Sequence, residues 1–454
     1  MDQSFDFINS ESLLDSTEEP PDQPPSLGRH LNFLSTNPGR FPALSHPHQF
    51  RLLHFPAITD AEWNDWHWQL KNRITSLDQL KKVLTLTADE LHAVANLRLP
   101  LSITPYYASL LHPDDPNQAL RRSVVPVSAE LTISPGESAD PLHEEADSPA
   151  PGLVHRYPDR VLFLVTSFCS TNCRYCTRSR IVGKHSRCGL GMAQWEKAIA
   201  YIEQTPQIRD VLLSGGDPLT LPDTRLEWLL TRLRRIPHVE VIRLGTKTPM
   251  VLPQRITPAL VRMLKRFHPL WLSIHCTHPA ELTEEAIAAC HRLADAGIPL
   301  GSQTVLLAGI NDDATVMTQL MQGLMRMRVK PYYLYQCDPI IGSAHFRTPV
   351  RNGLAIYEAM RGYTSGYAVP NYVIDAPGGG GKIPLLPETV VAMGEGRVIL
   401  KNYEGKLFSY PDTALVAADS FLTHTPRLAT TEERLQQTAA GNKRKRRSLR
   451  EAAA

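Results

Sequence analysis

The sequence lacks several features that would direct attention to membranes or nucleic acids. No apolar run reaches the roughly 18 residues that a membrane-spanning helix requires. The opening residues, MDQSFDFINSES, are acidic and lack the basic-then-apolar order of a secretory signal peptide. The formal net charge is only +2, which implies no acidic polymer as a partner. We therefore expect a cytoplasmic protein with no membrane and no nucleic-acid partner.

Cysteine is scarce and odd in number, with seven residues in a chain of 454. In a long chain without a secretion signal, this composition argues against a disulfide framework. Three of the seven nevertheless fall within eight residues, as Cys169, Cys173 and Cys176. Such clustering favours metal or cluster chemistry.

The composition changes along the chain and suggests five parts. Residues 1–28 are acidic and rich in proline, and we expect a flexible tail. Residues 29–152 are predicted to form a helical region that ends in a linker arm rich in Pro, Ser, Asp and Glu. A barrel is expected over 153–384 and a C-terminal extension over 385–424. Residues 425–454 contain KRKRR, which we interpret as a flexible, solvated basic tail rather than a nucleic-acid site.

From residue 160 onward, short apolar runs alternate with amphipathic stretches. The runs lie at 161–168, 211–214, 239–244, 271–275, 298–307, 331–335 and 372–374. Strands that alternate with helices are typical of an α/β fold with a parallel sheet. About six repeats predict a partial barrel of the (β/α)6 type.

Polar groups follow these apolar runs. They include Cys169, the Gly215-Gly216-Asp217 segment, His275, Asp338 and Asp375. In parallel barrels the chemistry lies at the carboxyl ends of the strands, so these groups are candidates for one site.

The cysteines form a C-x3-C-x2-C motif directly after a predicted strand. Three thiolates on one loop can bind three irons of a [4Fe–4S] cluster and leave the fourth iron open to a small molecule. A structural zinc site or an electron-carrying ferredoxin would typically supply four protein ligands, and chance clustering of core cysteines is a further alternative. The motif is the signature of the radical S-adenosylmethionine (SAM) superfamily, in which SAM binds the open iron and is cleaved to a 5′-deoxyadenosyl radical.

Two glycine-rich segments add to this picture. Ser214, Gly215, Gly216 and Asp217 resemble the superfamily segment that lines the methionine part of SAM, although Gly-Gly-Asp alone is also a common turn. Residues 375–382 read DAPGGGGK. They could form a flexible loop, and they lack the Gly and the Ser or Thr that a phosphate-binding P-loop needs. A lysine beside such a loop could instead form a Schiff base.

The cysteine motif and DAPGGGGK together resemble the lysine 2,3-aminomutase family. The likeness extends over roughly residues 60–410. Its sequence blocks include WNDWHWQLKNRI, ITPYYASL, DSPAPGLVHRYPDRVL, VLLSGGDPL, LADAGIPLGSQTVLL, KPYYLYQCD and VIDAPGGGGK.

The resemblance implies cofactor roles for individual residues. Cys169, Cys173 and Cys176 match the cluster ligands, and Lys382 matches the lysine that binds pyridoxal phosphate (PLP) as a Schiff base. Residues near the PLP phosphate are matched by Arg156, Tyr157 and Arg160. Residues near SAM are matched by His275, Gln303 and, in the same pocket, Tyr335.

The resemblance also implies how the substrate is held. Arg178 matches the arginine that binds the substrate carboxylate, which a guanidinium can do with two parallel hydrogen bonds. Asp338 and Asp375 match two aspartates that receive the ε-ammonium of lysine. Because a glutamate substrate would be repelled by this acidic pair, we expect lysine. Arginine, glutamate, a lysine destined for attachment to a translation factor, and a non-catalytic iron–sulfur protein are the alternatives.

The implied activity is that of an isomerase. It moves the α-amino group of L-lysine from C2 to C3 by a 5′-deoxyadenosyl radical and a PLP Schiff base, giving β-lysine. A reducing electron donor such as flavodoxin or ferredoxin and a homo-oligomer are expected. The family's zinc site is expected to be absent, because Asp313 replaces its barrel cysteine and no cysteine follows Cys337.

Overall fold

A computed structural model describes residues 47–183, 191–394 and 397–411. The acidic tail expected at 1–28 and the basic tail expected at 425–454 lie outside the described residues. The chain divides into two compact units, residues 1–386 and 387–454, and each is described by itself.

The first unit is built on a nine-stranded sheet in the order β1-β2-β3-β4-β5-β6-β7-β8-β9. Strands β2 to β8 are all parallel, whereas β1 and β9 are antiparallel edges. Within the described part of the chain β9 does not pair with β1, so the barrel is open on one side. The strands are β1 (Leu153–Tyr157), β2 (Arg160–Thr166), β3 (Asp210–Gly215), β4 (Val241–Thr246), β5 (Leu270–His275), β6 (Leu300–Leu306), β7 (Lys330–Gln336), β8 (Asn371–Ala376) and β9 (Gly381–Pro384).

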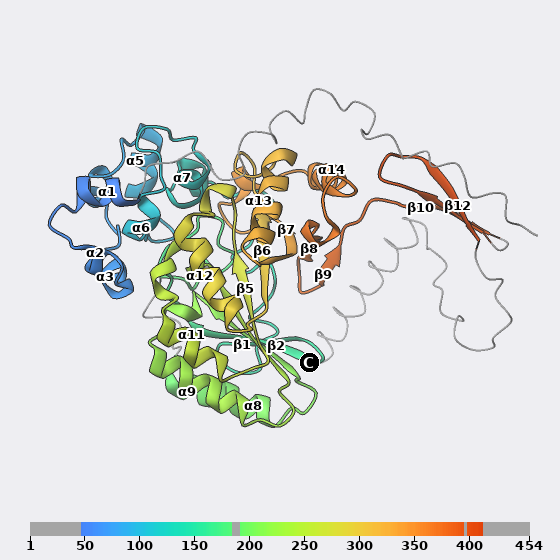
Figure 1. Ribbon diagram of the computed structural model, residues 1–454, viewed down its shortest axis with the longest axis horizontal. Helices are drawn as coiled ribbons and strands as arrows, with labels where there is room; N and C mark the ends of the chain where they lie inside the picture. The colour runs from blue at the N-terminus through green and yellow to red at the C-terminus, as the bar shows by residue number, and fades with distance from the viewer. Residues whose placement is uncertain (1–46, 184–190, 395–396, 412–454) are drawn as a thin grey trace, which may run out of the picture. The chain divides into compact units, whose positions relative to one another are not determined.

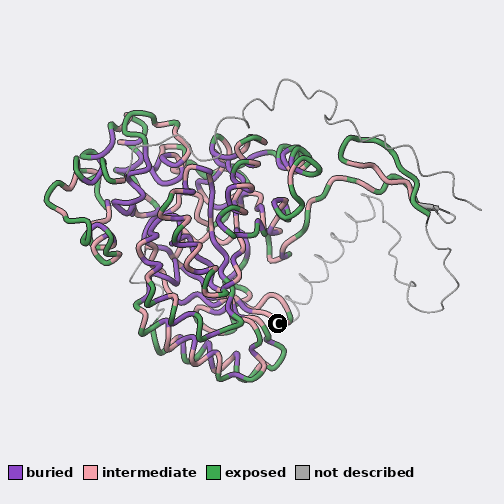
Figure 2. The backbone as a smooth tube through the Cα atoms, viewed as in Figure 1, coloured by how far each residue is buried: buried purple, intermediate pink, exposed green. Residues whose placement is uncertain are grey.

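A helix stands in each of the six connections between parallel strands. These helices are α8 (Met192–Glu203), α9 (Asp223–Arg234), α11 (Pro258–Lys265), α12 (Glu284–Asp295), α13 (Ala314–Arg326) and α14 (Val350–Met360). Figure 1 shows them on the outside of the strands, and Figure 2 shows the buried chain concentrated between the two layers. The partial (β/α)6 barrel predicted from the alternation of apolar runs is confirmed.

Local sequence signals explain where these elements begin and end. The side chain of Thr283 accepts a hydrogen bond from the backbone N–H of Ala286 and so caps α12. Gly297 adopts a φ of +77° just after this helix, a conformation that glycine allows without steric cost. On α12, Cys290 and Leu293 are buried in the barrel core. Burying one such leucine contributes about 1.5–3 kcal/mol.

Short helices precede the barrel and enclose a second apolar core. They are α1 (Pro47–His54), α2 (Asp60–Trp63), α3 (Trp66–Lys71), α4 (Leu77–Lys81), α5 (Ala88–Ala95), α6 (Pro105–Ala108) and α7 (Ala119–Val124). Further short elements are α10 (Thr248–Val251), η1 (Ser128–Leu131), η2 (Pro218–Thr220), η3 (Pro253–Arg255), η4 (Pro279–Glu281), η5 (Ala344–Phe346) and η6 (Gly366–Ala368). The Tyr107 hydroxyl donates to Glu281 at 2.7 Å and thereby joins the helical region to the barrel.

The arm at 134–152 is bonded to the barrel along its length. The backbone N–H of Ser138 donates to Pro339 at 2.9 Å, and that of Ile341 donates back to Ser138 at 3.2 Å. Pro141 accepts from the backbone N–H of Gly378 at 3.1 Å. The arm therefore joins the loop after β7 to the glycine-rich loop after β8.

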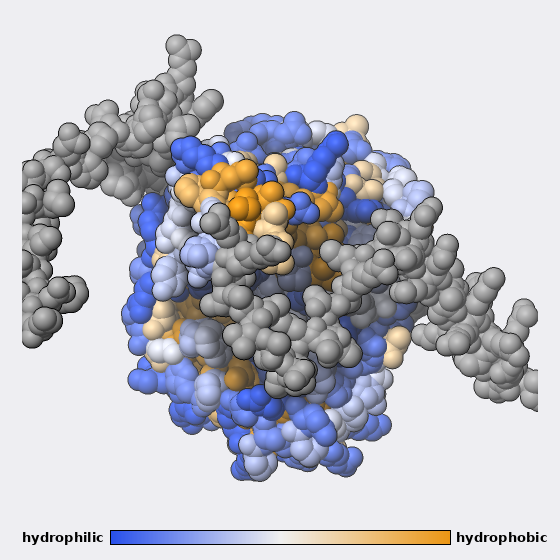
Figure 3. Space-filling view, turned by 90° about the vertical axis from the view of Figure 1, so that its right-hand side faces the viewer, coloured by the Kyte–Doolittle hydropathy of each residue, from blue (hydrophilic) through white to orange (hydrophobic). Residues whose placement is uncertain are grey.

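The second unit contains a three-stranded antiparallel sheet of β10 (Val390–Gly394), β11 (Arg397–Lys401) and β12 (Leu407–Pro411). Its large apolar side chains, including Val391, Met393 and Phe408, are exposed. Figure 3 shows apolar residues gathered on the face that this view presents. In neither unit does the described chain contain a helix with the length and apolar character needed to cross a bilayer.

Candidate active site

A cavity of about 500 Å³ lies inside the curved sheet. Its walls come from the arm, from strands β1 to β9 and from the loop that carries the cysteines. Many of the residues that the sequence predicted for the site line this cavity. They are Arg156, Tyr157, Arg160, Arg178, Ser214, His275, Gln303, Tyr335, Asp338, Asp375 and Lys382. The structure thus gathers residues that span more than two hundred positions of sequence. Their individual roles remain predictions.

The three cysteines lie on the loop that follows β2. Burial, together with the charges of the neighbouring thiols, raises the pKa of Cys169 well above its usual value, and burial raises that of Cys176 to about 11. The loop is fixed from outside, because Arg174 donates to Glu130 at 3.0 Å and to the carbonyl of Leu99 at 3.0 Å. A metal would displace the thiol protons on binding.

The three cysteines lie on one short loop, from Cys169 to Cys176. Across the described residues, no three Cys, His, Asp or Glu side chains converge on one point as ligands of a mononuclear site do. A [4Fe–4S] cluster binds each cysteine through a different iron, so its ligands need not converge. Three thiols on one loop are therefore a donor set that suits such a cluster.

Gly215 and Gly216 bring the end of β3 against the strand that leads into this loop. A Cβ atom on Gly216 would lie 2.2 Å from the carbonyl oxygen of Phe168, and one on Gly215 would lie 2.2 Å from that of Thr166. The Asp217 N–H donates to Phe168 at 2.8 Å. The glycines therefore allow a close backbone approach that any side chain would prevent.

The Asp217 side chain faces the protein rather than the cavity. Its carboxylate accepts from the Thr246 hydroxyl at 2.8 Å and from the backbone N–H groups of Lys247, Thr248 and Leu219 at 2.8, 3.1 and 3.0 Å. Its oxygens are thus bonded within the protein. Asp217 joins the ends of β3 and β4, and its place beside SAM stays a prediction.

A buried charged pair that sequence reasoning missed lies beside the cysteines. The Nζ of Lys247 is 2.5 Å from Glu281 and 3.1 Å from the hydroxyl of Thr277. Tyr175, from the cysteine loop, shares a hydrogen bond of 2.7 Å with the same hydroxyl. Burial opposes ionisation of Glu281, yet Lys247 holds its pKa below the usual value. The sequence around Lys247 does not indicate that Glu281, 34 positions further along the chain, is its partner.

Lys382 lies at the start of β9, at the edge of the cavity. Its backbone N–H donates to the Tyr157 hydroxyl at 2.9 Å, and its Nζ lies 2.9 Å from Oδ2 of Asp375. Gly381 makes the first contact possible, because a Cβ there would lie 2.9 Å from the same hydroxyl. The Arg160 guanidinium stacks on the Tyr157 ring at 3.9 Å. Two cations and a phenol at one end of a cavity suit a phosphate ester. PLP is a phosphate ester, and it also has a carbonyl group that can react with a lysine.

Arg156 lies between the arm and Asp375. It donates through Nε to Asp147 at 2.8 Å and through Nη2 to the carbonyl of Leu142. Its Nη1 lies 3.9 Å from Oδ1 of Asp375. That buried oxygen accepts no hydrogen bond from the described residues, so it can receive a donor from a ligand.

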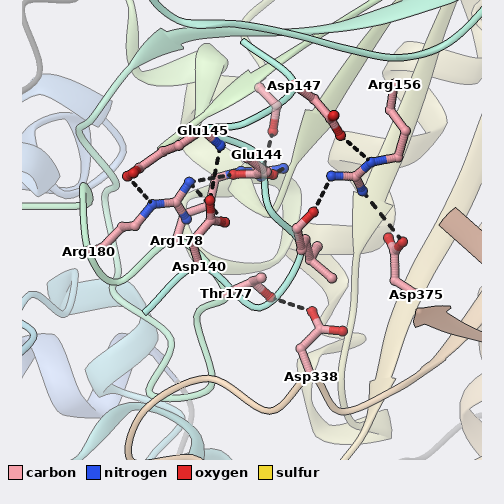
Figure 4. A network of polar contacts seen from close by, with 12 residues as sticks. Asp140, Glu144, Glu145, Asp147, Arg156, Thr177, Arg178, Arg180, Asp338 and Asp375 are labelled. Carbon is pink, nitrogen blue, oxygen red and sulfur yellow. Dashed lines mark hydrogen bonds and ion pairs between the residues drawn. The ribbon is translucent and has the colours of Figure 1, made fainter. Parts of the chain in front are cut away.

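Asp338 follows β7 and also lines the cavity. The Thr177 hydroxyl donates to its Oδ2 at 2.7 Å, as Figure 4 shows. Burial raises the pKa of Asp338 to about 6. The hydrogen bond from Thr177 lowers this pKa in part, whereas the negative charge of Asp375 raises it. The two carboxylates therefore form an acidic region that a cation would stabilise.

Arg178 follows the last cysteine and points toward the arm, where it meets Glu144 (Figure 4). Its Nε and Nη2 donate to Oε1 of Glu144 at 3.0 and 2.8 Å. Its Nη1 lies 3.5 Å from the hydroxyl of Ser214. Glu144 and Asp147 stand in a segment whose composition suggested a linker, so the sequence did not single them out.

His275, the last residue of β5, is the register partner of Gln303 in the middle of β6. Burial, helped by the charges of Lys247 and Arg178, lowers the pKa of His275 to about 4, so its imidazole is neutral near pH 7. Asp313, outside the cavity, caps α13 by accepting from Thr315 at 2.8 Å. The structure thus gives Asp313 a capping role, and the absence of a zinc site stays a prediction.

Comparisons with known proteins agree with this geometry. The sequence model of the radical SAM superfamily matches residues 163–320, which span the cysteine loop and most of the parallel sheet. That match defines the class of protein. The model described as lysine-2,3-aminomutase matches residues 357–448.

Relatives that match over most of the chain identify the family within this superfamily. The L-lysine 2,3-aminomutase of Clostridium subterminale is 53% identical over 360 residues, which are 79% of this chain and 86% of that protein. That of Bacillus subtilis is 53% identical over 78% of this chain and 76% of its own. The glutamate 2,3-aminomutase of Clostridioides difficile is 45% identical over 79% and 85%. The chain belongs to the lysine 2,3-aminomutase family, as its motifs predicted.

Proposed function

We propose that this protein moves the α-amino group of L-lysine from C2 to C3 and releases β-lysine. The observation that carries the proposal is the charge arrangement of the cavity, where Arg178 lines one region and Asp338 and Asp375 line another. L-Lysine offers a carboxylate to a guanidinium and a distant ammonium to carboxylates. The 53% identity to L-lysine 2,3-aminomutases over most of the chain supports the same substrate.

A [4Fe–4S] cluster and SAM follow from the superfamily, and we infer PLP as the third cofactor. When bound, the cluster and SAM would supply a carbon radical that removes a hydrogen atom. PLP would supply a conjugated carbonyl group that links to amines and stabilises an unpaired electron. Cys169, Cys173 and Cys176 would bind the cluster, and Lys382 would bind PLP. Arg156, Tyr157 and Arg160 would bind its phosphate, with Ser214, Gly215, Gly216, His275, Gln303 and Tyr335 near SAM.

The chain's own residues fix the substrate between two anchors. Arg178 binds the α-carboxylate, and the Asp338–Asp375 pair binds the ε-ammonium. With both ends fixed, C2 and C3 have little freedom to move, which favours reaction at one hydrogen. Asp375, at 2.9 Å from the Lys382 Nζ, can accept a hydrogen bond from that amine when the substrate displaces it.

Other assignments belong to the same proposal. We assign the catalytic barrel to 153–384, after a helical region at 29–152 and before an extension at 385–424. A low-potential donor such as flavodoxin or ferredoxin would reduce the cluster. The exposed apolar side chains of β10 and β12 support self-association, since large exposed apolar surfaces are typical of interfaces.

An anaerobic amino-acid screen tests the proposal. Protein loaded with iron, sulfide, SAM and PLP and given a strong reductant should convert L-lysine to β-lysine, with Cys173→Ala as the inactive control. Glutamate is the second candidate, because one relative acts on it by name. Asp338 and Asp375 disfavour glutamate by like-charge repulsion. Turnover of glutamate or arginine in preference to lysine would refute the substrate assignment.

A further inference from the structure

Glu144 occupies a position that the proposed reaction does not explain. It lies on the arm before β1, is 3% exposed and lines the cavity beside Arg178. The proposed reaction uses the guanidinium of Arg178 to bind a carboxylate of the substrate, and it gives no role to a buried carboxylate beside that guanidinium. A buried carboxylate is costly unless it is paired, so its presence calls for a reason.

The geometry of Arg178 supplies a reason. A planar guanidinium has a side edge, formed by Nε and Nη2, and an end edge, formed by Nη1 and Nη2. Glu144 takes the side edge, with Oε1 at 3.0 Å from Nε and 2.8 Å from Nη2. Among the residues that the structure describes, Ser214 is the one hydrogen-bond partner of Nη1, at 3.5 Å. The end edge is therefore the part of Arg178 that a ligand carboxylate can use.

Glu144 is itself held from a second direction. Arg180 donates to its Oε2 at 3.2 Å and also pairs with Asp140 and Glu145. Burial opposes ionisation of Glu144, but Arg178 and Arg180 together hold its pKa below the usual value. The carboxylate is thus charged, buried and fixed between two guanidinium groups, as Figure 4 shows. It could leave only by breaking both contacts.

We propose that Glu144 is a positioning residue, which binds the side edge of Arg178 and directs its end edge toward the α-carboxylate of the amino-acid substrate. This inference rests on the proposed function, because it takes Arg178 as the carboxylate anchor. The arm thereby contributes to substrate binding, although its composition resembles that of a linker. A competing reading makes Glu144 an occupant that the substrate carboxylate must displace. The two readings predict opposite changes in affinity.

The test compares Glu144→Gln with Glu145→Gln, a matched control on the same arm whose side chain is 77% exposed. Each protein carries iron, sulfide, SAM and PLP but receives no reductant, so that binding is measured without turnover. Calorimetry gives the dissociation constants of L-lysine and of L-lysine amide, which lacks the carboxylate. PLP absorbance and iron content check that each variant is loaded.

Glu144→Gln should weaken L-lysine binding by about tenfold, equivalent to about 1.4 kcal/mol, and leave the amide nearly unchanged. Glu145→Gln should change neither. A purely structural role for Glu144 would weaken both ligands alike, and displacement would tighten lysine binding, so either result overturns the proposal. Should Glu144→Gln not fold, Glu144→Asp keeps the charge, withdraws the carboxylate by one methylene and should show the same selective loss.

The experiment also separates this inference from the substrate assignment. If the parent protein binds no lysine, the proposed function fails. Arg178 would still face the α-carboxylate that all amino acids share. The same comparison then uses the amino acid found by the screen and its amide, and an unchanged preference in Glu144→Gln would again refute the positioning role.

Discussion

The substitution Asp338→Asn isolates the charge at the proposed ammonium site. An asparagine has nearly the same shape, and its amide oxygen can still accept the 2.7 Å hydrogen bond from Thr177. Asp375 is a less suitable choice because it also contacts Lys382 and Arg156. A change in substrate preference in Asp338→Asn can therefore be assigned to one lost charge.

The expected loss follows from the energy of one charge-assisted hydrogen bond. Such a bond contributes about 1.5–3 kcal/mol. At about 1.4 kcal/mol per power of ten, kcat/KM for lysine should fall by roughly one to two powers of ten. The loss could be larger, because a desolvated ammonium would retain only Asp375 as its counter-charge. Norleucine, which is uncharged at that end, should be unaffected or favoured.

The pH dependence gives an independent check. Burial raises the pKa of Asp338 to about 6, so its carboxyl group is charged above this pH and neutral below it. A cationic substrate should therefore lose affinity as the pH falls through 6, and the loss should be greater for lysine than for norleucine. The Asp338→Asn variant has no such group and should lack this difference.

The assay is kcat/KM for lysine and norleucine on both sides of pH 6, for the parent and Asp338→Asn. Bound PLP, iron content and uncoupled SAM cleavage should be equal in the two proteins. If the variant processes lysine as well as the parent does, Asp338 does not determine specificity. The substrate assignment would then rest on family resemblance alone.

Three further predictions concern the cofactors and the fold. Lys382→Ala should keep its iron but lose the PLP that borohydride attaches covalently in the parent, as peptide mapping would detect. Gly216→Ala should lower iron content, because its Cβ would lie 2.2 Å from the carbonyl oxygen of Phe168; normal loading would contradict this. Lys247→Met leaves Glu281 buried without its cation and should lower the unfolding free energy by about 3–5 kcal/mol in urea titrations. An unchanged urea midpoint would disprove that estimate.

The positions of the strands could be predicted because their signal is local. The apolar run at 271–275 corresponds to β5 (Leu270–His275), and the run at 331–335 corresponds to β7 (Lys330–Gln336). Buried parallel strands are apolar throughout and are bounded by amphipathic helices, so each can be recognised from its own residues. Their carboxyl ends then indicate which polar side chains share a site.

The partners of charged side chains could not be predicted in this way. Glu144 and Asp147 stand among Pro, Ser and other acids, a composition typical of a solvated linker, yet they bind Arg178 and Arg156. Asp217 follows a glycine pair that suggests ligand binding, but its carboxylate is bonded within the protein. Composition describes a segment, whereas an ion pair depends on a residue far away in sequence.

One stretch of backbone connects the functions proposed for this site. Cys176 is a proposed cluster ligand, Thr177 donates a hydrogen bond to Asp338, and Arg178 is the proposed anchor of the substrate carboxylate. Consecutive Cα atoms are about 3.8 Å apart, so the spacing of these three groups along the backbone is constant. In the proposed reaction this short segment would connect the cluster with the groups that bind both ends of the substrate. A radical that must take one hydrogen from C3 requires this constancy, because an error of about 1 Å in position can cost a hundredfold in rate.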